Sequence, residues 1–170
     1  QTCALPIFRP WMYAAAMTII VFICGTIAFQ TGKSVIRKQL TQISIEAPYG
    51  SKTKLYLPDG TLVWLNAGSK MSYAQDFGIN ERALNLTGEA YFEVAHDTQK
   101  PFVVSTEDMS IRVLGTKFNV KAYAEDEAVY TTLVSGSVRT NNKQSTYSTL
   151  LSPNEQCIYY PGNNRMETRK

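Results

Sequence analysis

A run of 19 residues near the start of the chain, from Trp11 to Phe29, contains no Asp, Glu, Lys, Arg or His. As an α-helix this run would measure about 28 Å, at about 1.5 Å per residue, which is close to the ~30 Å thickness of a bilayer's hydrocarbon core. Tyr13 stands with Trp11 at one end, where amphipathic rings favour a membrane interface. The run predicts a single transmembrane helix over residues 11–29.

Two other structures are compatible with an apolar run: a helix buried in a protein core and the apolar region of a secretion signal or lipoprotein signal. The core of a small domain does not usually hide 19 consecutive uncharged residues. The apolar region of a signal peptide usually spans about 7–15 residues. No clear small-residue cleavage site precedes Lys33. The membrane anchor is therefore the preferred interpretation.

The flanks of the run bear on its orientation. Arg9 precedes it, and Lys33, Arg37 and Lys38 follow it, so the positive-inside rule applied to these charges places the following domain in the cytoplasm. The chain does not begin with Met, and we interpret residues 1–10 as a truncated N-terminus whose first seven letters, QTCALPI, are foreign. Missing upstream charges would change the count, so the count does not decide the orientation.

A polar and basic connector, residues 30–46, follows the run. We expect a solvated juxtamembrane linker there, with contact to anionic lipid headgroups as the alternative. From Lys33 onward the chain carries all 14 acidic residues and every basic residue except Arg9. This near balance argues against a nucleic-acid binder, which needs a clustered basic face. Cys157 is the one cysteine of this part, which excludes an intradomain disulfide.

Short alternating runs separated by glycine begin at Ala47. Pro58-Asp59-Gly60 separates KLYL from TLVWLN, and an Asp-Gly pair between two β-prone runs predicts a hairpin. The same strand–glycine–strand unit recurs around Gly88, Gly115 and Gly136. We therefore expect residues 47–160 to be all-β, with about 8–11 strands in an antiparallel-rich β-sandwich or a short solenoid-like β-roll.

The alternating apolar residues predict which side of the strands faces the core. They are Leu55, Leu57, Leu84, Leu86, Phe92, Val94, Ile111, Val113, Phe118 and Val120. The last segment, residues 161–170, is polar, and we expect it to be an open linker to a further domain.

Few residues could carry chemistry, and each has a simpler explanation. His96 is the only histidine and stands in a turn-like stretch, so we expect it in an exposed loop. Asp59, Asp76, Glu89 and Glu93 could in principle supply a glycosidase pair. However, Asp59 belongs to a turn, Glu89 follows a turn glycine and is expected to bond backbone amides, and Glu93 alternates with core positions. We expect no catalytic residue, no cofactor and no metal site.

Two other sets of residues leave alternatives open. The acidic run 125–127 could bind a cation, although a solvated loop is the preferred interpretation. Strand packing explains the many aromatic residues, with a platform for a partner or a sugar as the alternative. These aromatic residues are Tyr49, Tyr56, Trp64, Tyr73, Tyr91, Tyr123, Tyr130, Tyr159 and Tyr160.

Six motifs, in order, resemble the FecR domain. They are LYLPDGT with WLNAGS (55–69), Arg82 with LTGEAYFEV (86–94), KPFVV (100–104), VLGTKFNV (113–120), LVSGSV (133–138) and LSPNEQ (151–156). Each motif is weak alone, but the ordered set covers most of residues 47–156 and is highly specific. The mostly structural motif residues are Asp59, Gly60, Asn66, Gly88, Glu89, Phe92, Pro101, Phe102, Gly115, Thr116, Phe118, Asn119 and Gly136.

The resemblance implies a transmembrane signal relay of the Bacteroidetes type that regulates an extracytoplasmic-function sigma factor. Such proteins report the state of an outer-membrane TonB-dependent transporter for iron chelates or glycans. The implied partners are the transporter's signalling domain and, through an anti-sigma domain that we expect to be absent here, the sigma factor. The implied location is the inner membrane, with residues 33–170 in the periplasm. A membrane-anchored carbohydrate-binding β-sandwich is the alternative, and an enzyme is not expected.

Overall fold

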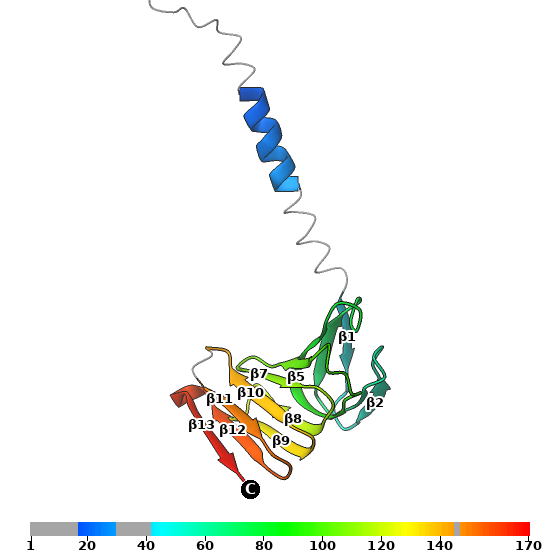
Figure 1. Cartoon of the computed structure of the whole chain (residues 1–170), viewed down its shortest axis with the longest axis vertical. Helices are drawn as coiled ribbons and strands as arrows, with labels where there is room; N and C mark the ends of the chain where they lie inside the picture. The colour runs from blue at the N-terminus through cyan, green and yellow to red at the C-terminus, as the bar shows by residue number, and fades with distance from the viewer. Residues whose placement is uncertain (1–16, 30–41, 145–146) are drawn as a thin grey trace, which may run out of the picture. The chain divides into compact units, whose positions relative to one another are not determined.

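The computed structural model describes residues 17–29, 42–144 and 147–170. The chain divides into two units, one ending at Thr41 and one spanning Gln42–Lys170. In the first unit residues 17–29 are helical (Figure 1). They belong to the membrane helix predicted over 11–29, of which residues 11–16 lie outside the described residues. Within the described residues, no helix has both the length and the apolar character that crossing a bilayer requires.

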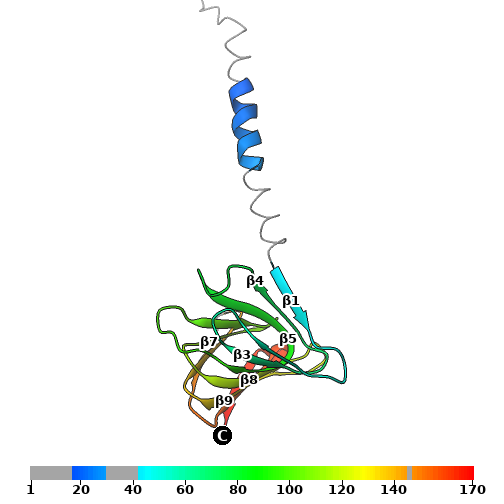
Figure 2. The ribbon, with the colours of Figure 1, turned by 90° about the vertical axis from the view of Figure 1, so that its right-hand side faces the viewer.

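The second unit is built from β-strands (Figures 1 and 2). Its described part contains β1 (Gln42–Glu46), β2 (Thr53–Tyr56), β3 (Leu62–Leu65), β4 (Lys70–Ala74), β5 (Arg82–Glu93), β6 (Phe102–Ser105), β7 (Met109–Val113), β8 (Lys117–Ala122), β9 (Val129–Ser135), β10 (Val138–Asn142), β11 (Ser148–Leu151), β12 (Gln156–Tyr160) and β13 (Arg165–Arg169). A short 3-10 turn, η1 (Pro161–Asn163), joins the last two strands.

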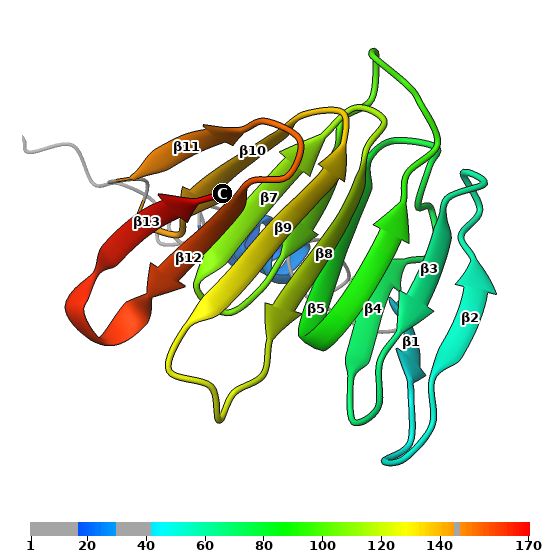
Figure 3. The same ribbon diagram turned by 90° about the horizontal axis from the view of Figure 1, so that it is seen from below.

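Two layers share the long strand β5. Its first half, up to Thr87, pairs with β4 antiparallel and with β6 parallel, and its second half, from Gly88, pairs with β3 and β8 antiparallel. One layer thus runs β1-β4-β5-β6-β7-β10-β11 and the other β2-β3-β5-β8-β9-β12-β13. Figure 3 shows β10 and β11 lying over β12 and β13, so the sheet nearly closes on itself. The prediction of an all-β, antiparallel-rich domain is confirmed, and its nearly closed sheet is barrel-like.

Strands also form in two segments that were expected to be linkers. Gln42–Glu46, within the connector 30–46, is β1 and pairs with β4, while residues 30–41 lie outside the described residues. Arg165–Arg169, within the expected open linker 161–170, is β13 and pairs with β12. Both expectations are wrong for these residues, because main-chain pairing at a sheet edge does not need apolar side chains and edge strands often carry charges.

The hairpin predicted at Gly88 is also wrong. β5 continues through this position, where Gly88 adopts φ +97° and marks the change of layer. At Gly60 and Gly136 the chain does turn, with φ of +82° and +95°, and at Gly115 it bends between β7 and β8. A glycine between two β-prone runs therefore marks a special backbone conformation without distinguishing a turn from a bend within a strand.

The core fills the space between the layers. Nine of the ten residues predicted to face inward are buried, and Leu55 is partly buried against them. At the centre, Phe92 stacks on Phe118 with ring centroids 5.1 Å apart and meets Phe102 edge-on at 5.9 Å. Full burial of each such side chain contributes about 1.5–3 kcal/mol. This core fixes the strands that carry the polar groups described next.

Candidate functional site

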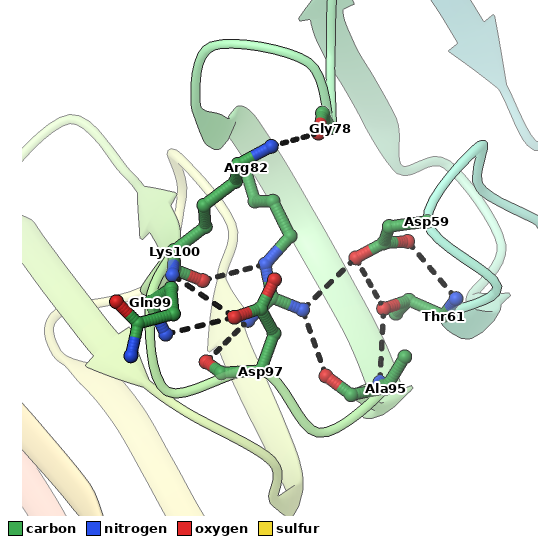
Figure 4. A network of polar contacts seen from close by, with 8 residues as sticks. All are labelled: Asp59, Thr61, Gly78, Arg82, Ala95, Asp97, Gln99 and Lys100. Atoms are coloured by element: carbon green, nitrogen blue, oxygen red, sulfur yellow. Dashed lines mark hydrogen bonds and ion pairs between the residues drawn. The ribbon is translucent and has the colours of Figure 1, made fainter.

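A buried arginine ties together the loops at one end of β5 (Figure 4). Arg82 is 2% exposed, and its guanidinium donates three hydrogen bonds to main-chain carbonyls. Nε bonds the oxygen of Lys100 at 2.7 Å, Nη1 that of Ala95 at 2.7 Å and Nη2 that of Asp97 at 3.1 Å. One side chain therefore holds the segment between β5 and β6 at three points.

Asp59, in the turn between β2 and β3, is the anionic partner of Arg82 (Figure 4). Its Oδ2 lies 3.2 Å from Nη1 of Arg82, and the two side chains are 7% and 2% exposed. Thr61 donates its backbone N–H to Oδ1 at 2.9 Å and its hydroxyl to Oδ2 at 2.8 Å. The predicted turn role of Asp59 is confirmed, and the buried ion pair is an addition that sequence analysis missed.

The same network reaches the loop between β4 and β5. Lys100 donates from Nζ to the carbonyls of Gly78 at 3.1 Å and Ile79 at 2.7 Å. Asp97 accepts the backbone N–H groups of Gln99 and Lys100 at 2.8 and 3.1 Å, and these bonds hold the pKa of its carboxyl below the ordinary value. Three connections far apart in sequence are thus joined into one polar cluster.

A second group of motif residues surrounds Glu89, on the outer face of β5. Its Oε2 accepts from the amide of Asn66 at 2.8 Å, and its Oε1 accepts from the amide of Asn119 at 2.9 Å. The expectation that this carboxylate bonds backbone amides is wrong, because side-chain amides on both flanking segments satisfy its oxygens. The bonds cross-link three neighbouring parts of the sheet.

Gly88 lies directly against Ser69. A Cβ on Gly88 would come within 2.7 Å of the Ser69 Cβ and 2.8 Å of its Cα. The Ser69 hydroxyl accepts the N–H of Glu89 at 2.8 Å and bonds the Tyr123 hydroxyl, which donates to the carbonyl of Ala67 at 3.0 Å. Gly88 is therefore required by a close approach of two backbones as well as by its positive φ.

The third group of motif residues forms a corner between the β7–β8 bend and the β9–β10 turn. Thr116 donates its hydroxyl to the carbonyl of Ser137 at 3.0 Å, and its own carbonyl accepts the N–H of Val94 at 3.0 Å. Gly115 packs on His96, whose Cα would lie 2.8 Å from a Cβ at that glycine. His96 is exposed, as predicted.

The other candidate residues have separate surroundings. Phe92, Phe102 and Phe118 lie in the core, and Pro101 immediately precedes β6. Glu93 pairs with Lys117 at 3.2 Å on the sheet surface, and Asp76 accepts from Asn80 at 2.9 Å. Within the described residues, no group of three or more His, Cys, Asp or Glu side chains is arranged to hold a metal ion.

Arg82 belongs to the resemblance to the FecR domain, but it was not among the candidate site residues. A signal was available, because Arg82 alternates with Leu84 and Leu86 and therefore occupies an inward position. For the contact between Ser69 and Tyr123 no local signal exists, since the two residues are 54 positions apart.

This geometry defines a class of protein: a two-layer all-β domain in which one strand belongs to both layers and a buried Arg–Asp pair lies beneath the loops. The chain matches the FecR protein family over residues 43–139, more than half of its length. It belongs to that family, which confirms the resemblance.

Two crystal structures, each of a candidate anti-sigma factor from Parabacteroides distasonis, are similar to this chain. One, at 1.65 Å resolution, has a TM-score of 0.71 and 38% identity, covering 75% of this chain and 59% of the other. The second, at 2.50 Å, has a TM-score of 0.72 and 37% identity, covering 76% and 60%. The chain thus spans about 60% of the length of these relatives. No curated protein matches it.

Proposed function

We propose that this chain is part of a transmembrane relay that regulates an extracytoplasmic-function sigma factor. The single observation that carries the proposal is membership of the FecR family, together with 37–38% identity to a candidate anti-sigma factor. The matched region covers about three quarters of this chain, so the likeness extends over most of its length. In this proposal the β unit has a regulatory role and catalyses no reaction.

In this relay, residues 11–29 cross the inner membrane once and the β unit senses the signal in the periplasm. The uncharged sequence of 11–29 and the helical state of residues 17–29 support the anchor. The cross-linked loops around Arg82 suit a sensor, because a rigid domain transmits a contact on one surface to another.

The incoming signal in this proposal is contact with the signalling domain of a TonB-dependent transporter that imports an iron chelate or a glycan. Among the described strands, β1, β2, β11 and β13 are each hydrogen-bonded on one side only. Unpaired main-chain groups at such an edge are a template for a strand from another protein. We expect the transporter domain to use one of these edges.

The carbohydrate-binding alternative has less support. Trp64 and Tyr91 do form an aromatic pair on the outer face, with ring centroids 5.4 Å apart. However, Lys54 lies over the Trp64 ring, with Nζ 5.3 Å from its centroid, so the ring already has contacts on the sheet surface.

The functional test uses the complete gene and its neighbours. The complete protein should co-purify with the sigma factor, and a transcriptional reporter for that factor should lose its response to the transporter's substrate when residues 42–170 are deleted. A matched variant, Lys70→Ala, removes an exposed ion pair with Glu46 and should keep the response. A complete protein that does not bind the sigma factor would contradict the proposal.

Orientation is tested by a fusion placed after Lys170 in the complete protein. Alkaline phosphatase needs an oxidising compartment to form its disulfides, so we expect an active enzyme if the β unit is periplasmic. The visible flanking charges favour the opposite orientation, which makes the test decisive. A fusion that is inactive as phosphatase and fluorescent as a cytoplasmic reporter would overturn both the location and the transporter contact.

A further inference from the structure

A cavity of about 630 Å³ lies where the two layers separate along β5. Leu86 and Thr87 line it at the end of the first half of β5, just before Gly88 changes the pairing partners. The turn after β6, the β8–β9 connection and the η1 turn also contribute to the lining. Small-molecule sites usually have about 300–1,000 Å³ and often lie at the mouth of a barrel-like sheet, so size and place both suit a ligand.

Part of the lining is apolar or aromatic. Leu86, Ala122 and Val129 contribute buried side chains, and Tyr123 and Tyr160 contribute half-buried rings. The Tyr123 hydroxyl is occupied by its bonds to the Ser69 hydroxyl and to a main-chain carbonyl. Such a lining favours the hydrocarbon part of a ligand. The chain's own cations already lie over the two rings: Lys121 Nζ is 5.8 Å from the Tyr123 centroid, and the Arg165 guanidinium is 4.9 Å from that of Tyr160.

The rest of the lining carries negative charge from two separate connections. Glu107 and Asp108 come from the turn between β6 and β7, and Asp126 and Glu127 come from the connection between β8 and β9. From the sequence, a solvated loop was the preferred interpretation of Asp126 and Glu127, with cation binding by the acidic run as the alternative. The fold instead brings them to the same cavity as a second acidic pair.

Nearby cations compensate this charge only in part. Lys121 pairs with Asp126 at 2.9 Å, and the charge of Lys143 acts on Asp108. Burial, and next the charge of Glu107, nevertheless raise the pKa of the Asp108 carboxyl. Lys121 and Lys143 thus act on Asp126 and Asp108, whereas the lining contains four carboxylates, in a chain whose overall formal charge is +3.

We propose that the cavity binds an organic cation, an ammonium or guanidinium group on an apolar stem. The charged group lies among the four carboxylates, and the stem lies against Leu86, Val129 and the two tyrosine rings. This chemistry has two sources: a free polyamine, or a lysine or arginine side chain of a protein partner. The inference rests on the cavity and its lining and does not depend on the sigma-factor proposal.

The test is a calorimetric titration of the 170-residue chain, in an uncharged detergent at physiological ionic strength. Two probes are used separately: spermidine, and a capped glycine-arginine-glycine peptide. We expect saturable binding of at least one probe and no binding of fully acetylated spermidine. Spermidine alone indicates a free polyamine as the source, and binding of the peptide indicates a protein side chain.

Two variants separate the cavity from the rest of the surface. Glu107→Gln combined with Asp108→Asn should weaken binding at least about tenfold, because charge-assisted bonds are lost, while the thermal midpoint stays that of the parent chain. Glu93→Gln, which removes a carboxylate paired with Lys117 on the outer face of the sheet, should leave affinity within about twofold.

Three results would overturn the proposal. The first is that neither probe binds. The second is that the two variants weaken binding equally, which indicates a general charge effect. The third is that calcium binds while neither probe does, which indicates an inorganic cation site.

Discussion

Replacing Gly88 with alanine should lower the free energy of unfolding of the β unit by about 2–5 kcal/mol. The backbone at Gly88 has φ +97°, which costs a residue with a side chain about 1–2 kcal/mol. The new methyl group would also lie 2.8 Å from the Cα of Ser69, so a backbone must move, and such overpacking costs about 1–3 kcal/mol more. Urea unfolding followed by tryptophan fluorescence measures the difference.

Gly60→Ala is the matched control. Gly60 has a similar φ of +82°, but no atom lies within 4 Å of the position that its Cβ would take. We therefore expect the conformational cost alone, about 1–2 kcal/mol. Equal losses for the two variants would contradict the idea that Gly88 is required by the close approach to Ser69.

This pair of glycines also explains where sequence-based prediction of the fold succeeded and failed. Both stand between β-prone runs and both have positive φ, but the turn predicted at each of them is correct only at Gly60, because β5 continues through Gly88. The two glycines differ in what surrounds them: Gly88 packs against Ser69, which lies 19 positions earlier in the chain. The residues next to either glycine do not indicate this contact. Alternation, by contrast, is local, and it correctly predicted inward residues such as Phe118 and Val120.

The candidate site was predictable to a smaller degree. Asp59 was found through its turn, yet its ion pair spans 23 positions to Arg82. Glu89 was marked as a motif residue, but its two asparagine partners depend on strand register, which short-range patterns do not fix. The cavity combines three connections that only the completed topology brings together, so the sequence indicated neither Glu107 nor Asp108, and a solvated loop was preferred over cation binding for the run 125–127.

At both ends of the β unit, polar sequences that predict linkers form edge strands. β13 has the sequence RMETR, and its residues Arg165 and Arg169 both lie close to Glu167. Such a composition is typical of a linker, but it is also what an edge strand needs to avoid uncontrolled pairing with other chains. Only the hydrogen bonds to β12 distinguish the two.

Replacing Arg82 with methionine should destabilise the β unit by about 3–5 kcal/mol. Methionine keeps much of the side-chain volume, so the change mainly removes the buried charge and its hydrogen bonds. Asp59, 7% exposed, would lose its counter-ion, and three main-chain carbonyls would lose their donors. Breaking a buried pair by removing one partner typically costs this much, because the remaining charge is left without compensation.

Two further variants identify the origin of that loss. Lys70→Ala breaks the 2.6 Å pair with Glu46, whose side chains are 57% and 63% exposed, and should cost no more than about 1 kcal/mol. Adding Asp59→Asn to Arg82→Met removes the uncompensated charge, so the double variant should recover about 1–2 kcal/mol. The loss of unfolding free energy that remains in the double variant then measures the hydrogen bonds that the carbonyls of the β5–β6 segment have lost. If the double variant is less stable than Arg82→Met alone, the bonds from Thr61 to Asp59 outweigh the cost of its buried charge, and the main role of Asp59 is to fix the turn.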